Sequence, residues 1–243
     1  SLAWDLNLGR FGRHKLAGLA EHAKLRAFRY PGVEILVDEQ GVPRRQGPER
    51  AAEPAALVEY LRQGTAIMNP TAMIRRAVVE RIGGYRSAYR YTEDYDFWLR
   101  SAEVTKIANL PERLLQYRYH SAQASHRYAV AQIIAAVAAY AAYCERLESR
   151  PDPTDGLETL PDIEELGRLF GQEDMPRMIR ERVLSQIDYN VAAYRNGGTD
   201  ILIEALRRKE FPDRRRALRI AARLLRAGQY GNGLRIARSS WLG

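Results

Sequence analysis

The chain has 243 residues, enough for one large domain or for one medium domain with an appendage. Its single cysteine, Cys144, excludes an internal disulfide framework and a zinc site built from cysteines alone. The formal net charge of +8, from 38 Lys and Arg against 30 Asp and Glu, suits an acidic ligand, an anionic membrane surface or nucleic acid.

The N-terminal part of the chain predicts a helix, a strand and a loop. Apolar residues between Phe11 and Phe28 recur at helical spacing, and Pro31-Gly32 is expected to end that helix. The alternating, β-branched residues 33–37 predict a strand. Several Pro, Gly and charged residues in 43–54 predict a surface loop, and residues 55–63 predict a short helix.

The next segment has two clear breaks. Residues 64–76 contain two strand-like pieces, expected to be kinked at Asn69-Pro70 because proline does not fit inside a central strand. Residues 77–82 predict a short helix, which Gly83-Gly84 ends as a C-cap pair. A further helix is expected to run from the acidic stretch that follows to about Val104.

Short strands follow this helix. Residues 106–110 predict one strand, Pro111-Glu112 a turn, and residues 114–120 a second strand. Helices thus alternate with short strands without any internal repeat, which indicates an α/β arrangement.

Beyond residue 125 the predicted structure is helical. Residues 128–147 predict a helix whose Ala-rich part, interrupted by Gln132, is too short for a membrane span and is expected to be buried. No secretory signal is recognisable. Residues 151–156 predict a break in the chain. The remaining predicted helices are 162–170, 175–194, 199–209, 213–227 and 232–241.

The stretch Tyr91–Arg100 places three carboxylates, those of Glu93, Asp94 and Asp96, at the start of a predicted helix. Thr92 is a good N-cap, and acidic groups in the first turn suit the positive end of a helix dipole. Taken alone, the stretch is explained by helix capping. The motifs on both sides of this stretch indicate a role beyond helix capping.

Five short motifs follow one another between residues 64 and 125. They are Asn69-Pro70-Thr71-Ala72-Met73-Ile74-Arg75-Arg76, Gly83-Gly84-Tyr85-Arg86, Glu93-Asp94-Tyr95-Asp96-Phe97-Trp98-Leu99-Arg100, Leu110-Pro111-Glu112 and Tyr117-Arg118-Tyr119-His120. In this order they resemble the C-terminal half of the catalytic domain of inverting family-2 glycosyltransferases, which have the GT-A fold. Each motif alone is weakly specific, whereas the ordered set is specific.

The resemblance implies a partial GT-A-like α/β domain with a mixed, short-stranded sheet over residues 1–126, followed by an all-α, Arg-rich extension over 127–243. It implies transfer of a hexosyl-type sugar, with inversion, from a nucleotide-diphosphate-sugar donor to the hydroxyl of a saccharide or lipid-linked acceptor. Enzymes of this kind build cell-envelope polysaccharides. We therefore expect a cytoplasmic location, with peripheral attachment to the inner face of the membrane.

An inverting transfer needs a base that takes the proton of the acceptor hydroxyl as it attacks the anomeric carbon. In the resembled family this base is the Asp of the Glu-Asp pair, which corresponds to Asp94. Glu93 would then position the acceptor or the base. A carboxylate at a loop-to-helix junction is expected to be exposed, held by the capped backbone and kept ionised by the helix dipole. Asp96 lies elsewhere on the helix, where a structural role is favoured over a catalytic one.

The leaving diphosphate must be neutralised by a metal or by cationic side chains. Arg118 and His120 alternate on a predicted strand, so Arg118 could hold phosphate oxygens, and His120 could bind the diphosphate or a metal, or pack at the strand end. The resemblance implies Mg²⁺ or Mn²⁺, with Asp5 at the family's Asp-x-Asp position, although only one acid is present there. Arg75 and Arg76 could also face phosphate, but a solvated surface pair is favoured.

The resembled domain begins with a nucleotide-binding half, and no strand, Gly-rich turn and helix unit of that kind is recognisable here. Arg10-Phe11-Gly12-Arg13 resembles the helix start that follows the family's metal motif. Because the chain begins with Ser1 and not Met, we expect a fragment cut near that motif in preference to a degenerate relative. Either form alone is expected to bind nucleotide poorly and to be weakly active or inactive.

The Arg-rich C-terminal helices support an alternative hypothesis, a non-catalytic binding or scaffold module. Basic residues from Arg207 to Arg238 interleave with apolar residues from Leu206 to Trp241, a pattern typical of helices that bind an anionic membrane surface or a partner helix. The competing interpretation is that these helices pack on the domain and expose a solvated Arg face. Nucleic acid is not expected as a partner, because aromatic residues do not interleave with the basic ones.

Overall fold

The computed structural model describes residues 27–37, 40, 42–46, 53–62, 64–65, 67–118 and 127–242. They form two compact units, one from the described residues of 1–84 and 100–119, the other from those of 85–99 and 120–243. The expected domain boundary at residue 126 stays a prediction, because it falls in a segment outside the described residues.

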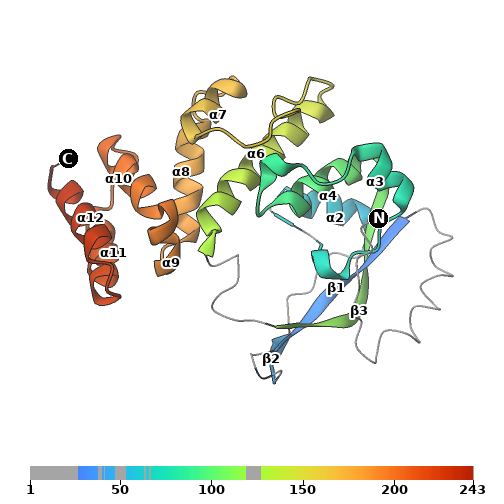
Figure 1. The fold of residues 1–243 in the computed structure, drawn as a ribbon, viewed down its shortest axis with the longest axis horizontal. Helices are drawn as coiled ribbons and strands as arrows, with labels where there is room; N and C mark the ends of the chain where they lie inside the picture. Colours follow the sequence, from blue (N-terminus) through green and yellow to red (C-terminus); the bar gives the residue numbers. More distant parts are fainter. Residues whose placement is uncertain are drawn as a thin grey trace. The chain divides into compact units, whose positions relative to one another are not determined.

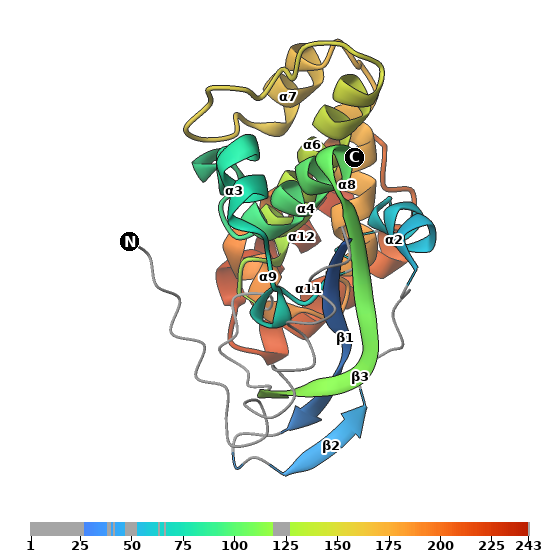
Figure 2. The ribbon, with the colours of Figure 1, turned by 90° about the vertical axis from the view of Figure 1, so that its right-hand side faces the viewer.

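The first unit contains a three-stranded mixed sheet of β1 (Ala27–Val37), β2 (Pro43–Gln46) and β3 (Lys106–Arg118). The strand order is β2-β1-β3 (Figure 2). β1 pairs with β2 antiparallel and with β3 parallel. The predicted strand 33–37 is confirmed as the second half of β1.

The sheet corrects three expectations. β1 continues through Pro31-Gly32, and β3 continues through Pro111-Glu112, where the expected turn is absent. At the predicted breakers, the register between β1 and β3 is irregular instead. Pro31 is opposite Leu110 and Val33 is opposite Arg113, so β3 has one residue more than β1 between these two pairs. Pro31 is tolerated in the middle strand because, within the described residues, β2 pairs only with Ile35–Val37 and leaves that edge of β1 without a partner at the proline.

The third correction concerns residues 43–54, expected to be a loop. Pro43 begins β2, a position where the missing N–H of proline costs no ladder hydrogen bond.

The described part of this unit also contains three short helical segments: α2 (Pro54–Leu61), the 3-10 helix η1 (Asn69–Thr71) and α3 (Arg76–Ile82). α2 and α3 confirm the predicted helices. The strand-like pieces expected around Asn69-Pro70 are wrong for the described residues of 64–76, because Pro70 instead lies inside a 3-10 turn. The Thr71 hydroxyl supports that turn by donating to Met68 O at 2.7 Å.

The core of the first unit lies where α2 packs against β3. Leu57 and Leu61 of α2 and Ile107 and Leu110 of β3 are buried, and so is Ile67. Burying one such side chain stabilises the fold by about 1.5–3 kcal/mol.

The second unit begins with the 3-10 helix η2 (Ser87–Tyr89) and most of α4 (Glu93–Val104). α4 confirms the helix expected after the acidic stretch. The next helix is α6 (Ala129–Leu147). By length and composition alone, α6 is the one helix of the described part that could cross a membrane, and 39% of its apolar window is buried within the protein. That buried side packs against α8, as expected for a helix of the core.

The rest of the second unit is helical (Figure 1). Its elements are α7 (Ile163–Leu169), α8 (Met175–Gln186), α9 (Val191–Ala193), the kinked segment η3 (Tyr194–Gly198), α10 (Thr199–Arg207), α11 (Arg214–Arg226) and α12 (Tyr230–Leu242). The single helix expected over 175–194 is wrong at its C-terminal end, because α8 ends at Gln186 and Asn190 begins a new helix by accepting from Ala193 N–H.

The described chain is thus mostly helical, with one small mixed sheet. An α/β part followed by a helical extension agrees with this architecture.

Candidate active site at the start of α4

Asp94 lies in the first turn of α4 with its side chain half-buried, so the expected exposure of this carboxylate is wrong. Its Oδ1 accepts a hydrogen bond from Tyr95 N–H at 2.8 Å, which fixes one carboxylate oxygen at the helix start. Burial raises the pKa of Asp94 above its usual value and outweighs the hydrogen bond from Tyr95, and the charge of Glu93 raises it further. No cationic side chain of the described residues forms an ion pair with Asp94.

Glu93 is the first residue of α4 and is also half-buried. Its Oε2 is buried and has no hydrogen-bond partner within the described part of the chain. A buried carboxylate oxygen without a donor is costly in a folded protein.

The backbone before α4 is attached to α6 by two hydrogen bonds. Gln132 Nε2 donates to Tyr91 O at 2.9 Å, and the Thr92 hydroxyl donates to Gln132 O at 3.3 Å. Thr92 O accepts from Tyr95 N–H and Asp96 N–H, so Thr92 occupies the expected N-cap position.

Tyr91 has a positive φ of 69°, which is unusual for an aromatic residue and costs about 1 kcal/mol or more. Its ring stacks on Tyr128, with centroids 3.9 Å apart and planes within 6°. Arg90 lies over the Tyr91 ring at 5.0 Å, and Arg127 lies over the Tyr128 ring at 5.5 Å. The four side chains form a stack that holds Tyr91 in its strained conformation.

Asp96 is fully buried and forms an ion pair with Arg86, whose Nε donates to Asp96 Oδ2 at 3.1 Å. Arg86 Nη1 donates to Asp152 Oδ2 at 2.8 Å, and Arg146 pairs with the same carboxylate. Burial opposes the charge on Arg86, yet its bonds to Asp96 and Asp152 raise its pKa. This geometry favours the structural role of Asp96 over a catalytic one.

The same network orients the loop after α6. Although burial opposes it, hydrogen bonds from Thr154 and Arg86 lower the pKa of Asp152 to about 2. The Thr154 hydroxyl also lies 2.7 Å from Tyr89 OH, whose pKa is raised by burial to about 12. Arg86 and Tyr89, which both precede the acidic stretch, are therefore fixed to one loop.

The Gly-Gly motif ends α3, as expected. Gly83 and Gly84 have φ of 78° and 74°, and both donate their N–H to Val79 O. Arg100, in the first unit with α3, donates to Ile82 O and to Gly84 O, the latter at 2.7 Å. The last carbonyls of α3 are satisfied in this way.

The residues expected at the diphosphate are described only in part. Arg118 is the last residue of β3, and His120 and Asp5 lie outside the described residues. No group of three or more His, Cys, Asp or Glu side chains in the described ranges could hold a metal ion. Arg76 is exposed and pairs with Glu80 at 2.6 Å, which agrees with a solvated surface role.

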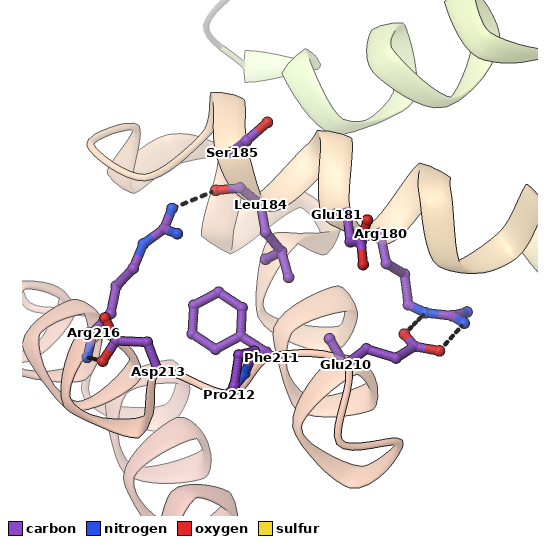
Figure 3. A pocket seen from close by; sticks show the side chains of 10 residues that line it. Arg180, Glu181, Leu184, Ser185, Glu210, Phe211, Pro212, Asp213 and Arg216 are labelled. Atoms are coloured by element: carbon purple, nitrogen blue, oxygen red, sulfur yellow. Dashed lines mark hydrogen bonds and ion pairs between the residues drawn. The ribbon is translucent and has the colours of Figure 1, made fainter.

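A cavity of about 300 Å³ lies in the second unit, beside α8 and the connection from α10 to α11 (Figure 3). Phe211 and Leu184 line its apolar part. Its two arginines are engaged: Arg180 binds Glu210 through two hydrogen bonds of 2.6 and 2.7 Å, and Arg216 binds Leu184 O at 3.0 Å. Because both arginines are engaged within the protein, we interpret the cavity as part of a fixed junction between α8 and the connection from α10 to α11.

Comparisons of the chain with protein-family models, with curated proteins and with solved structures find no match.

Sequence reasoning missed the stack of Tyr91 on Tyr128 and the anchoring role of Gln132. One weak signal was present: of the four Arg-Tyr dipeptides in the sequence, those at 90–91 and 127–128 each stand just before a helix. The role of Asp152 was also missed, because residues 151–156 indicated only a break in the chain.

Proposed function

We propose that this chain is the acceptor-side portion of an inverting GT-A glycosyltransferase and that Asp94 is its general base. The observation that carries the proposal is the state of the Asp94 carboxylate. It is oriented by Tyr95 N–H, has no cationic partner in the described part, and has a pKa raised by burial. A general base works best when its pKa is shifted toward the working pH.

The surroundings of Asp94 support the same proposal. A strained residue, Tyr91, lies three positions before it, and such residues cluster at active sites. The buried Arg86–Asp96 pair holds the first turn of α4 rigidly, as a catalytic carboxylate requires.

In the proposed reaction Asp94 takes the proton of the acceptor hydroxyl. The hydroxyl oxygen forms a bond to the anomeric carbon from the face opposite the leaving group. The bond between the anomeric carbon and the diphosphate oxygen breaks, and the nucleoside diphosphate leaves with the bonding electrons. The anomeric configuration is therefore inverted. Arg118 and His120 are the proposed contacts of the diphosphate, and Mg²⁺ or Mn²⁺ the proposed cation.

The test uses the protein expressed with whatever its gene encodes upstream of Ser1. It is incubated with a panel of nucleotide-diphosphate sugars and saccharide or lipid-linked acceptors, and release of nucleoside diphosphate is measured with and without acceptor. Asp94→Asn is expected to lower acceptor-dependent release by at least about a hundredfold.

The matched control is Glu103→Gln, which removes an exposed carboxylate from the other end of α4 and is expected to keep full activity. If Asp94→Asn kept near-normal turnover, the base assignment would be wrong. If the wild-type protein transferred sugar from no donor in the panel, the alternative of a non-catalytic binding module would be favoured.

A further inference from the structure

The net charge of the chain is concentrated at its C-terminal end. Residues 214–243 contain eight Arg and no Lys, Asp or Glu, so they carry +8. The other 213 residues balance the remaining 30 basic side chains against all 30 acidic ones. The whole excess positive charge therefore lies on α11 and α12.

α11 has an apolar inner side and a cationic outer side. Ala217, Ile220, Ala221 and Leu224 are buried. Arg216 and Arg223 are used internally, because they donate to Asp188 Oδ1 and to Asp188 O.

The outer side of α11 is exposed and carries Arg215, Leu218, Arg219 and Arg226. Arg215 and Arg226 form no ion pair within the described ranges, and Arg219 has only a loose pair of 3.6 Å with Asp213. The guanidinium groups of Arg215 and Arg226 can therefore bind an external anion, and that of Arg219 can do so by giving up its loose pair.

α12 exposes a stripe of large apolar side chains. Tyr230, Leu234 and Trp241 are 66%, 62% and 79% exposed. Spacings of four and seven residues place the three on one side of the helix, beside exposed Arg238. Some apolar residues of this region that the sequence interleaves with arginine, such as Ile220 and Ile236, are buried in the structure. Tyr230, Leu234 and Trp241, by contrast, stay exposed to solvent.

The outer sides of α11 and α12 face the same way. The two helices pack together and are joined by three residues, so they run antiparallel (Figure 1). A Cβ on Gly233 would meet Ala221 O and Leu225, which identifies the contacting flanks.

An α-helix turns by about 100° per residue. On each of the two helices, the outer residues therefore lie roughly a quarter to a third of a turn away from the residues that contact the other helix. The direction of this rotation along the sequence is the same on both helices. Equal rotations in an antiparallel pair bring the two outer sides to one surface. We call it the α11–α12 face; its residues are Arg215, Leu218, Arg219, Arg226, Tyr230, Leu234, Arg238 and Trp241.

We propose that the α11–α12 face docks on the surface of an anionic lipid bilayer. Tyr and Trp rings prefer the boundary between headgroups and acyl chains, and the Leu side chains would enter the apolar layer. The arginines would bind lipid phosphates, with no acidic side chain on either helix to repel them. A nucleic acid duplex would satisfy the arginines but would leave the stripe without an apolar partner. This inference does not rest on glycosyl transfer.

The test is co-sedimentation of the full chain with vesicles of phosphatidylcholine alone or mixed with phosphatidylserine. Binding is expected only to the anionic vesicles and should weaken with added salt. Of the three tryptophans, Trp98 is buried and Trp241 exposed, so binding should shift the Trp241 emission to the blue. Trp241→Ser with Leu234→Ser should weaken binding about tenfold or more, and Arg215→Gln with Arg226→Gln by a similar factor.

The matched controls are Met178→Ser, an exposed apolar residue of α8, and Arg207→Gln, an exposed arginine of α10, and neither should change binding. All variants are at exposed positions, and circular dichroism checks their fold. Equal binding to neutral vesicles, or an unchanged affinity of both double variants, would overturn the proposal. So would tighter binding to duplex DNA or RNA than to anionic vesicles, or a self-association that Trp241→Ser abolishes in place of vesicle binding.

Discussion

Arg86 and Asp96 form a buried ion pair that joins the Gly-Gly-Tyr-Arg motif to the acidic start of α4. Asp96 is fully buried, and Arg86 Nε donates to its Oδ2 at 3.1 Å. Two motifs that are ten residues apart thus meet through side chains. The pair fixes the helix turn from which Asp94 projects.

Breaking this pair is expected to destabilise the protein strongly. Asp96→Asn removes the negative charge and leaves Arg86 buried beside a neutral amide, at a cost of about 3 kcal/mol in the free energy of unfolding. Urea unfolding followed by circular dichroism measures the change. The control is Glu80→Gln, which breaks the exposed Arg76–Glu80 pair and should cause no measurable change. Similar effects of the two variants would contradict the structural role of Asp96.

Asp152 is expected to make part of the protein's stability sensitive to acid. Its folded-state pKa of about 2 is below the ordinary value of 3.8. A carboxyl with a lowered folded pKa contributes stability above its unfolded pKa and loses it as the pH falls toward the folded pKa. The contribution is about 2 kcal/mol at neutral pH and disappears between about pH 4 and pH 2.

Asp152→Asn tests this window. The variant should be less stable than the wild type at neutral pH, and the difference should shrink as the pH falls from about 4 to about 2. Unfolding midpoints in urea measured across this range give the comparison. A difference that does not depend on pH would mean that Asp152 acts through packing alone.

For Asp94, the expected effect of ionisation on the free energy of unfolding has the opposite sign. Its pKa is raised in the folded state, so the ionised carboxylate is disfavoured by folding above the ordinary carboxyl pKa. Asp94→Asn should therefore leave the free energy of unfolding at neutral pH unchanged or higher, while it removes the proposed activity. Thermal unfolding at neutral pH measures the first effect.

The pKa of Asp94 can be tested directly by carboxyl NMR titration. It should lie above 3.8 in the wild type and should fall in Glu93→Gln, because the charge of Glu93 raises it. Glu103→Gln, at the other end of α4, should leave the Asp94 titration unchanged. A value at or below 3.8 in the wild type would remove the main support for Asp94 as base.

Two glycines of α12 are expected to respond in opposite ways to alanine. A Cβ on Gly233 would lie 2.7 Å from Leu225 Cγ and 2.9 Å from Ala221 O, so Gly233→Ala should separate α11 from α12 and cost about 1–3 kcal/mol. Gly231 has nothing within 4 Å of its Cβ position, so Gly231→Ala should stabilise the helix by about 0.5–1 kcal/mol. Thermal unfolding separates the two outcomes. Equal shifts would contradict the close approach of the helices.

Much of the helical architecture could be predicted from local signals in the sequence. Gly83-Gly84 ended α3 because left-handed φ values are strained for other residues, and Asp213 began α11 by accepting from Arg216 N–H. These signals act over a few residues, so they are visible without the fold. The same reasoning failed at Pro31 and Pro111, because both lie inside strands at the point where the register of β1 and β3 is irregular.

At the candidate site, the sequence by itself determined the acidic start of α4 and the identity of Asp94 as the proposed base. Only the tertiary structure assigned Asp96 to Arg86, stacked Tyr91 on Tyr128, and divided the C-terminal apolar residues into a buried set and an exposed stripe. The reason is physical. A helix start is specified by neighbours along the chain, whereas the pairing of a carboxylate and the exposure of a leucine depend on residues that only folding brings together.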